Sequence, residues 1–133
     1  MPSWSLQQSI FAALTADTAL TALLGPGRVF DDVPQGAALP YVTLGQVTLR
    51  DASTATEEGA EHSITVHVWS DARGKKETHA ILAAIRGAVH DRPLALTGHR
   101  LVNLRHELSE VRRALDGATI HGTARFRALT EPL

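Results

Sequence analysis

Between residues 61 and 90 the spacing of apolar side chains changes from every second residue to helical spacing. This change constrains the fold more than any other feature. In "EHSITVHVW" (61–69) apolar and polar residues alternate, which is typical of a strand with one buried face. From 75 to 90 the apolar residues follow helical spacing and form one stripe: Ala80, Ile81, Ala84, Ile85, Ala88 and Val89. Pro93 prevents the helix from continuing. A strand followed by an amphipathic helix predicts a sheet with a helix on one face.

The N-terminal part of the chain predicts two helices. Ser5 with Gln8 matches a capping box ahead of apolar residues at helical spacing, so we expect a helix that begins at Ser5. Asp17 has the position of an N-cap for a short second helix, which "GPG" at 25–27 should end. A short strand over 29–31 leads into "VPQGAALPY". This segment is either a connector that its prolines hold extended or a loop that docks on a neighbouring subunit.

Residues 41–50, "YVTLGQVTLR", predict a strand whose apolar residues fall on both faces around Gly45. This strand should pair with residues 61–69 as a hairpin. The tip of the hairpin is long, polar and without an apolar anchor, so we expect a mobile loop. Loops of this kind often carry function.

Residues 99–112 and 119–130 predict a second hairpin, which turns around "LDGA". We expect its apolar side chains to share the inner face: Val102, Leu104 and Leu108 on the first strand, and Ile120, Ala124, Phe126 and Ala128 on the second. A three-residue loop, Asp116 to Ala118, would achieve this by placing Leu108 opposite Phe126. The same register pairs Glu107 with Arg127 and Ser109 with Arg125 on the outer face.

These elements predict one α+β domain over residues 1–133. Its mostly antiparallel sheet would consist of β-hairpin, helix and β-hairpin, with the N-terminal helix and the second helix packed on one face. A length of 133 residues supports one core rather than two. The net charge of −1 gives no global field toward nucleic acid or an anionic membrane.

Composition also bears on the compartment. The chain has no cysteine, which excludes disulfides and thiolate zinc sites. The start, "MPSWSLQQSIF", lacks the basic and then apolar pattern of a signal peptide, and no apolar run reaches membrane-spanning length. We expect a protein that is made and kept in a cytoplasm, or carried in a particle assembled there.

Catalytic and metal-binding signatures are missing from the sequence. "RHELSEVRR" begins like the zinc motif H-E-x-x-H, but its fifth position is Glu110 and the segment alternates like a strand. There is no G-x-S-x-G elbow, phosphate-binding loop or dinucleotide fingerprint. We therefore expect no enzymatic activity, cofactor or metal.

The strand at 61–69 carries two histidines and a tryptophan, which raises the question of a metal or ligand site. His62 and His67 should point to opposite faces, since side chains alternate along a strand, and so they cannot bind one metal ion. His67 beside Trp69 has two interpretations: a ligand-binding pair, or a strand face that packs on a helix or a neighbouring subunit.

Five arginines gather on or near one face of the final hairpin: Arg105, Arg112, Arg113, Arg125 and Arg127. Glu107 and Glu110 lie among them. This face is either a solvated, self-neutralising surface or a subunit interface built from arginine–carboxylate pairs. A nucleic-acid surface is not favoured, because aromatic side chains are missing and acidic residues interrupt the stripe.

Five segments follow one another in an order that resembles a known family: "LTADTALTALLG", "GRVFDDVPQGAALPYVTLG", "STATEEGAEHSITVHVWS", "AILAAIRGAVHD" and "LVNLR". Together they resemble the tail-completion, or tail-terminator, family of long-tailed phages and phage-like gene transfer agents. The resemblance runs from about Leu6 to Thr130.

This resemblance implies a structural α+β protein of the virion, located at the head-proximal end of the tail and assembled in the bacterial host cytoplasm. It implies a homo-oligomeric ring, expected to be a hexamer, that caps the tail tube and stops its polymerisation. The partners would be the tail-tube protein and the head–tail connector or stopper, with DNA passing through the lumen. The family has no catalytic residues to assign.

A ring subunit needs two different contact patches. We expect one on the final hairpin, with Arg105, Glu107, Arg112, Arg113, Arg125 and Arg127, and the other along the strand edge from Tyr41 to Arg50. The acidic tip, with Asp51, Glu57, Glu58 and Glu61, should face the tail tube or the lumen, where it would repel DNA phosphates. The alternatives are a head–tail connector or stopper, and a small enzyme or ligand-binding domain that uses His67 and Trp69.

Overall fold

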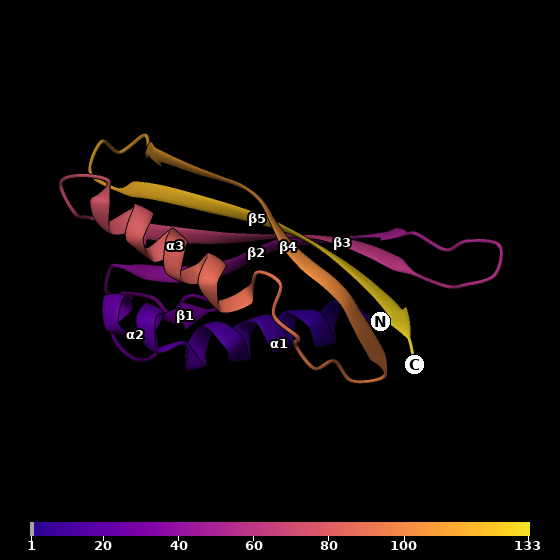
Figure 1. Ribbon diagram of the computed structural model, residues 1–133. Helices are drawn as coiled ribbons and strands as arrows, with labels where there is room; N and C mark the ends of the chain where they lie inside the picture. Colours follow the sequence, from indigo (N-terminus) through magenta and orange to yellow (C-terminus); the bar gives the residue numbers. More distant parts are fainter. Residues whose placement is uncertain (1) are drawn as a thin grey trace.

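The computed structural model describes residues 2–133 and confirms the α+β class. A five-stranded sheet has the order β1-β2-β3-β5-β4, and its pairs are antiparallel except for β1 with β2. Three helices pack on one face of the sheet (Figure 1). The elements are α1 (Pro2–Ala16), α2 (Thr18–Leu24), β1 (Val29–Phe30), β2 (Tyr41–Asp51), β3 (Ala60–Ser70), α3 (Lys76–Val89), β4 (His99–Arg113) and β5 (Ile120–Pro132). No helix within residues 2–133 has the length and apolar character needed to cross a membrane.

The core lies between the helices and the inner face of the sheet. Ile64, Val66 and Val68 of β3 are buried, as their alternation predicts, and they pack with Ile85 of α3 and Ile10 of α1. Each such side chain contributes roughly 1.5–3 kcal/mol when it is removed from water. None of the described helices covers the opposite, outer face of the sheet (Figure 1).

The first hairpin contains the irregularity that the sequence indicates at Gly45. The register between β2 and β3 shifts between Leu44 and Val47, so the apolar residues of β2 change face there. A Cβ at Gly45 would lie 2.6 Å from Nε2 of His67. Glycine is therefore needed at this position, where a side chain of the neighbouring strand crosses the backbone.

The predicted loop and register of the second hairpin are wrong. The loop runs from Leu115 to Ala118, one residue longer than expected, because the Asp116 carboxylate accepts the N–H groups of Ala118 and Thr119, both at 2.9 Å. Leu108 consequently pairs with Arg125 rather than Phe126. Ser109 pairs with the buried Ala124 rather than with Arg125.

Two irregularities in β4 add to this error. The register with β5 shifts between Leu101 and Asn103 and again between His106 and Leu108. Val102 is therefore 43% exposed instead of sharing the inner face with the buried Leu104. A bulge changes the face of every later side chain, and regular alternation cannot anticipate it.

The prediction for the first helix is also wrong at its start. Helix α1 begins at Pro2, whose fixed φ and missing N–H suit the first turn. Ser5 does not cap a helix, since its hydroxyl accepts the N–H of Thr97 at 2.7 Å and ties the segment before β4 to α1. The N-cap prediction at Asp17 is confirmed, because its carboxylate accepts the N–H of Leu20 at 2.9 Å.

Candidate functional site

An ion network on the outer face joins three strands. The Arg127 guanidinium lies 3.0 Å from the carboxylate of Glu107 on β4 and 3.5 Å from that of Glu61 on β3. Arg125 lies 4.0 Å from Glu107. The predicted proximity of Glu107 and Arg127 is thus present, but through the bulge of β4 and not through direct pairing. Exposed pairs of this kind contribute only about 0–1 kcal/mol each, so they can exchange partners at an interface at little cost.

The structure divides the five arginines of the final hairpin into two groups. Arg105 pairs with Arg127 in the β4–β5 register and lies 3.4 Å from the Asp91 carboxylate, so it belongs with the outer-face network. Arg112 and Arg113 lie at the far end of β4, away from that network.

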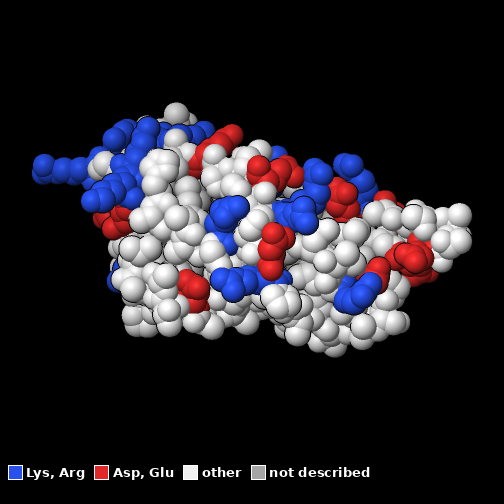
Figure 2. Space-filling view, in the orientation of Figure 1, with Lys and Arg blue, Asp and Glu red and all other residues white. Residues whose placement is uncertain are grey.

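Arg112 and Arg113 gather instead with the start of α3. The Arg113 guanidinium donates to the carbonyl of Arg73 at 3.3 Å. Five exposed cations therefore form what we call the basic end: Arg73, Lys75, Lys76, Arg112 and Arg113. Figure 2 shows Lys and Arg side chains gathered at this end of the molecule.

The opposite end carries the β2–β3 loop, which projects beyond the helices (Figure 1). We call Asp51, Glu57, Glu58 and Glu61 the acidic tip. The first three are exposed, whereas Glu61 is paired with Arg127. The acidic side chains at this end are visible in Figure 2.

The loop of the acidic tip is hydrogen-bonded internally, although it has no apolar anchor. Asp51 accepts the hydroxyl and the N–H of Ser53, at 2.6 and 3.1 Å. These two bonds lower the pKa of the Asp51 carboxyl. The N–H of Thr54 donates to the carbonyl of Glu57 at 2.7 Å, and the N–H of Ala52 donates to the carbonyl of Gly59 at 2.9 Å.

The predicted edge from Tyr41 to Arg50 is only partly open. Strand β1 pairs with β2 at Val42 and Thr43 alone. From Leu44 onward, no described strand occupies that side of β2. Strand β4 forms the opposite edge of the sheet. Unpaired edges can accept a strand from another chain, and so both edges are candidate contact surfaces.

The two strand histidines lie on opposite faces, as predicted. His62 is buried on the inner face, where its ring Nε2 is 2.9 Å from the Thr130 hydroxyl and burial lowers its pKa. His67 lies on the outer face with Nδ1 2.8 Å from Nε2 of His121. Trp69 stacks on His121 with ring centroids 4.0 Å apart.

Sequence reasoning missed His121 because it lies 54 positions from His67 in the chain. Burial lowers the pKa of both imidazoles, and His67 and Arg112 lower that of His121 further. The indole N–H of Trp69 donates to the Thr43 hydroxyl at 3.3 Å. One nitrogen of each imidazole and the indole N–H of Trp69 therefore have partners within the protein. Within residues 2–133, no group of three or more His, Cys, Asp or Glu residues is arranged to hold a metal ion.

Comparison with known proteins gives a consistent result. Residues 8–131 match the family described as tail completion protein gp17. A chain from the virion of a native gene transfer agent particle is 35% identical, with 98% of this chain and 97% of that chain covered and a TM-score of 0.91. The bacteriophage SPP1 gp17 protein is 22% identical over 95% of this chain and 88% of that chain, and its TM-score of 0.63 shows a shared fold alone. No curated protein sequence matches.

Proposed function

Because the chain belongs to the tail completion protein gp17 family, we propose that it forms a ring that caps a tail tube and ends its polymerisation. The chain is a structural component of a phage or gene transfer agent tail. The observation that carries the proposal is the similarity to a virion chain over 98% of the sequence. The ring has six subunits, lies at the head-proximal end of the tail and presents a surface for head joining.

The geometry supports a ring because the molecule has unlike surfaces on opposite edges of one sheet. A cyclic assembly needs two different patches on each subunit. One is the β4–β5 face with Arg105, Glu107, Arg125 and Arg127, together with Arg112 and Arg113 at the far end of β4. The other is the β2 edge from Tyr41 to Arg50, which is open from Leu44 onward.

The remaining partners are the tail-tube protein on one side of the ring and the head–tail connector or stopper on the other. Assembly takes place in the host cytoplasm, and DNA later passes through the lumen. Glu57 and Glu58 at the acidic tip are exposed and unpaired among the described residues, which suits a surface that repels phosphate. We place this tip at the lumen, with the tube as the alternative.

The chain acts by assembly and not by catalysis in this proposal. The arrangement around His67 supports a structural role, because its ring bonds to His121 and the neighbouring Trp69 bonds to Thr43. A small ligand would have to displace these contacts before it could bind.

The test is electron microscopy of particles from a strain that lacks the gene, scored for tail length and head attachment. We expect overlong, headless tails that return to uniform length when the purified protein is added. Headless tails of normal length would instead identify a connector or stopper. Fully normal particles would contradict any role in the tail.

A further inference from the structure

The exposed side of α1 has the composition of a contact surface. Asp17 is the only charged residue before Arg28, so α1 carries no charge at all. A helix on the surface of a soluble protein ordinarily presents charged side chains to solvent. Here Trp4 is 58% exposed and Phe11 is 37% exposed. Aromatic residues with few charges are characteristic of the centre of a protein interface.

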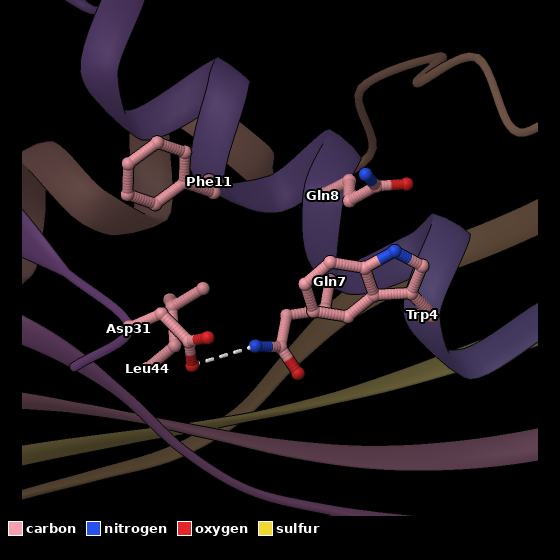
Figure 3. Close-up of a pocket in the computed structure, with 6 residues that line it drawn as sticks. All are labelled: Trp4, Gln7, Gln8, Phe11, Asp31 and Leu44. Carbon is pink, nitrogen blue, oxygen red and sulfur yellow. Dashed lines mark hydrogen bonds between the residues drawn. The ribbon is translucent and has the colours of Figure 1, made fainter.

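A groove of about 390 Å³ lies beside these aromatic side chains. It is lined by Trp4, Gln7, Gln8, Phe11, Asp31 and Leu44. Figure 3 shows the α1 side chains along one side of it and Asp31 with Leu44 opposite them. The Gln7 amide donates to the Asp31 carboxylate at 2.8 Å. Asp31 and its neighbour Asp32 are exposed, and they make this margin of the groove acidic.

A matching apolar projection lies on the same chain. Leu115, in the loop between β4 and β5, is fully exposed at 107% of its reference area. The Asp116 carboxylate fixes this loop through bonds from Ala118 and Thr119. The loop is therefore already ordered, which reduces the entropy lost on binding. Arg112 and Arg113 of the basic end lie immediately before it.

We propose that Leu115 of one copy inserts into the α1 groove of a second copy, with Arg112 and Arg113 facing Asp31 and Asp32. The inference rests on the ring proposed above and names one of its contacts. The groove adjoins β1 at one edge of the sheet, and the loop follows β4 at the other edge. One copy therefore offers both halves of the contact at once, which is the condition for a head-to-tail ring. The margin of the groove is acidic and the residues before Leu115 are basic, which favours this orientation of the two copies.

The absence of cysteine from the chain makes cross-linking a direct test. A strain would carry Gln8→Cys with Leu115→Cys as its only copy of the gene, and purified tails would be oxidised. We expect covalent dimers and larger species, up to the full ring, on non-reducing gels. The matched control is Leu115→Cys with Ala83→Cys, because Ala83 is exposed on α3 and does not line the groove. This control should remain monomeric.

A second measurement covers the case in which cysteines disturb assembly. Leu115→Ser should weaken each contact roughly tenfold to a hundredfold, as expected for one exposed leucine side chain, and should produce overlong tails. The matched control is Leu133→Ser, because Leu133 is also highly exposed but lies at the end of the chain. Circular dichroism of the purified variants should match that of the unaltered protein, since both leucines are exposed.

The outcomes separate this inference from the proposed function. If tails have normal length but the cysteines at positions 8 and 115 do not cross-link, the groove contact is wrong. The proposed ring is unaffected by that outcome. A cross-link from position 8 to another tail protein would overturn it as well. Normal tails in the gene-deletion strain would overturn the proposed function itself.

Discussion

The basic end and the acidic tip lie at opposite ends of one sheet, and they differ in more than charge. Each end carries a loop that an aspartate fixes by hydrogen bonds: Asp116 in the β4–β5 loop at the basic end, and Asp51 in the β2–β3 loop at the acidic tip. The basic end exposes the large apolar side chain of Leu115, whereas the acidic tip contains no apolar residue larger than alanine. Burial of an apolar side chain drives association, and charge alone does so only weakly. We therefore assign contact between copies to the basic end and repulsion of phosphate to the acidic tip.

Charge reversal should give the largest difference in tail length between variants of the two ends. Arg112→Glu with Arg113→Glu places like charges against the acidic margin of the groove, at a cost of several kcal/mol per contact. We expect overlong tails by electron microscopy. Glu57→Lys with Glu58→Lys is the matched change at the acidic tip and should leave tail length unchanged. Equal effects at the two ends would refute the division of roles.

The packing that positions the basic end can be disturbed from within. A Cβ at Gly122 on β5 would lie 2.6 Å from Cγ2 of the buried Thr78, in the first turn of α3. Gly122→Ala should lower the free energy of unfolding by about 1–3 kcal/mol, since helix and strand must separate. Thermal denaturation measures this change.

The control for Gly122 is another glycine in open space. Nothing lies within 4 Å of a Cβ built at Gly87 in α3. Gly87→Ala should therefore raise stability by about 0.5–1 kcal/mol, because alanine loses less backbone entropy in a helix. Destabilisation by both substitutions would mean that close packing at Gly122 is not the cause.

The histidine cluster next to the basic end should make stability depend on pH. The pKa values of His67 and His121 are lowered in the folded protein, so the unfolded chain binds more protons as the pH falls. Stability should be complete above about pH 6.5, the unperturbed value, and should decrease below it at up to roughly 1.4 kcal/mol per pH unit for each group. Chemical denaturation at several pH values measures this.

A matched pair of variants isolates the cluster. His121→Gln should reduce the pH dependence between pH 5 and 7, because it removes one group and relieves the burial of the other, while the buried His62 still contributes. The matched control is His79→Gln, at an exposed position of α3 outside the cluster. An unaltered slope in the His121 variant would show that other groups set the acid sensitivity.

Neutralising the acidic tip should have the smallest effect, confined to DNA passage. Glu57→Gln with Glu58→Gln removes exposed charge but keeps Asp51, which holds Ser53, and Glu61, which pairs with Arg127. We expect slower DNA ejection, because phosphates would be repelled less, with tail length unchanged. A change in tail length without a change in ejection would argue that the tip meets the tail tube.

Sequence reasoning predicted the features that depend on neighbouring residues. Alternation placed Ile64, Val66 and Val68 on one face of β3, and His62 and His67 on opposite faces. The helix cap at Asp17 and the irregularity at Gly45 also follow from local chemistry. The proximity of Arg125 and Arg127 to Glu107 was predicted for the same reason, since these charged residues alternate with apolar ones along their strands.

Tertiary structure decided the features that depend on contacts between distant segments. The four-residue loop placed Leu108 opposite Arg125, and the bond from Arg113 to the carbonyl of Arg73 brought the far end of β4 to the start of α3. The stacking of Trp69 on His121 required two strands to meet in one register.

The sequence by itself determined the class of fold and which side chains share a face in each regular strand, because short-range periodicity sets which side chains can be buried together. The family was indicated separately, by the resemblance of five ordered segments, and the match over residues 8–131 shows it. The tertiary structure alone decided that the groove beside α1 and the exposed Leu115 lie at opposite edges of one sheet. The reason is physical: strand order and bulge position depend on how the whole core packs, and no local pattern of residues carries that information.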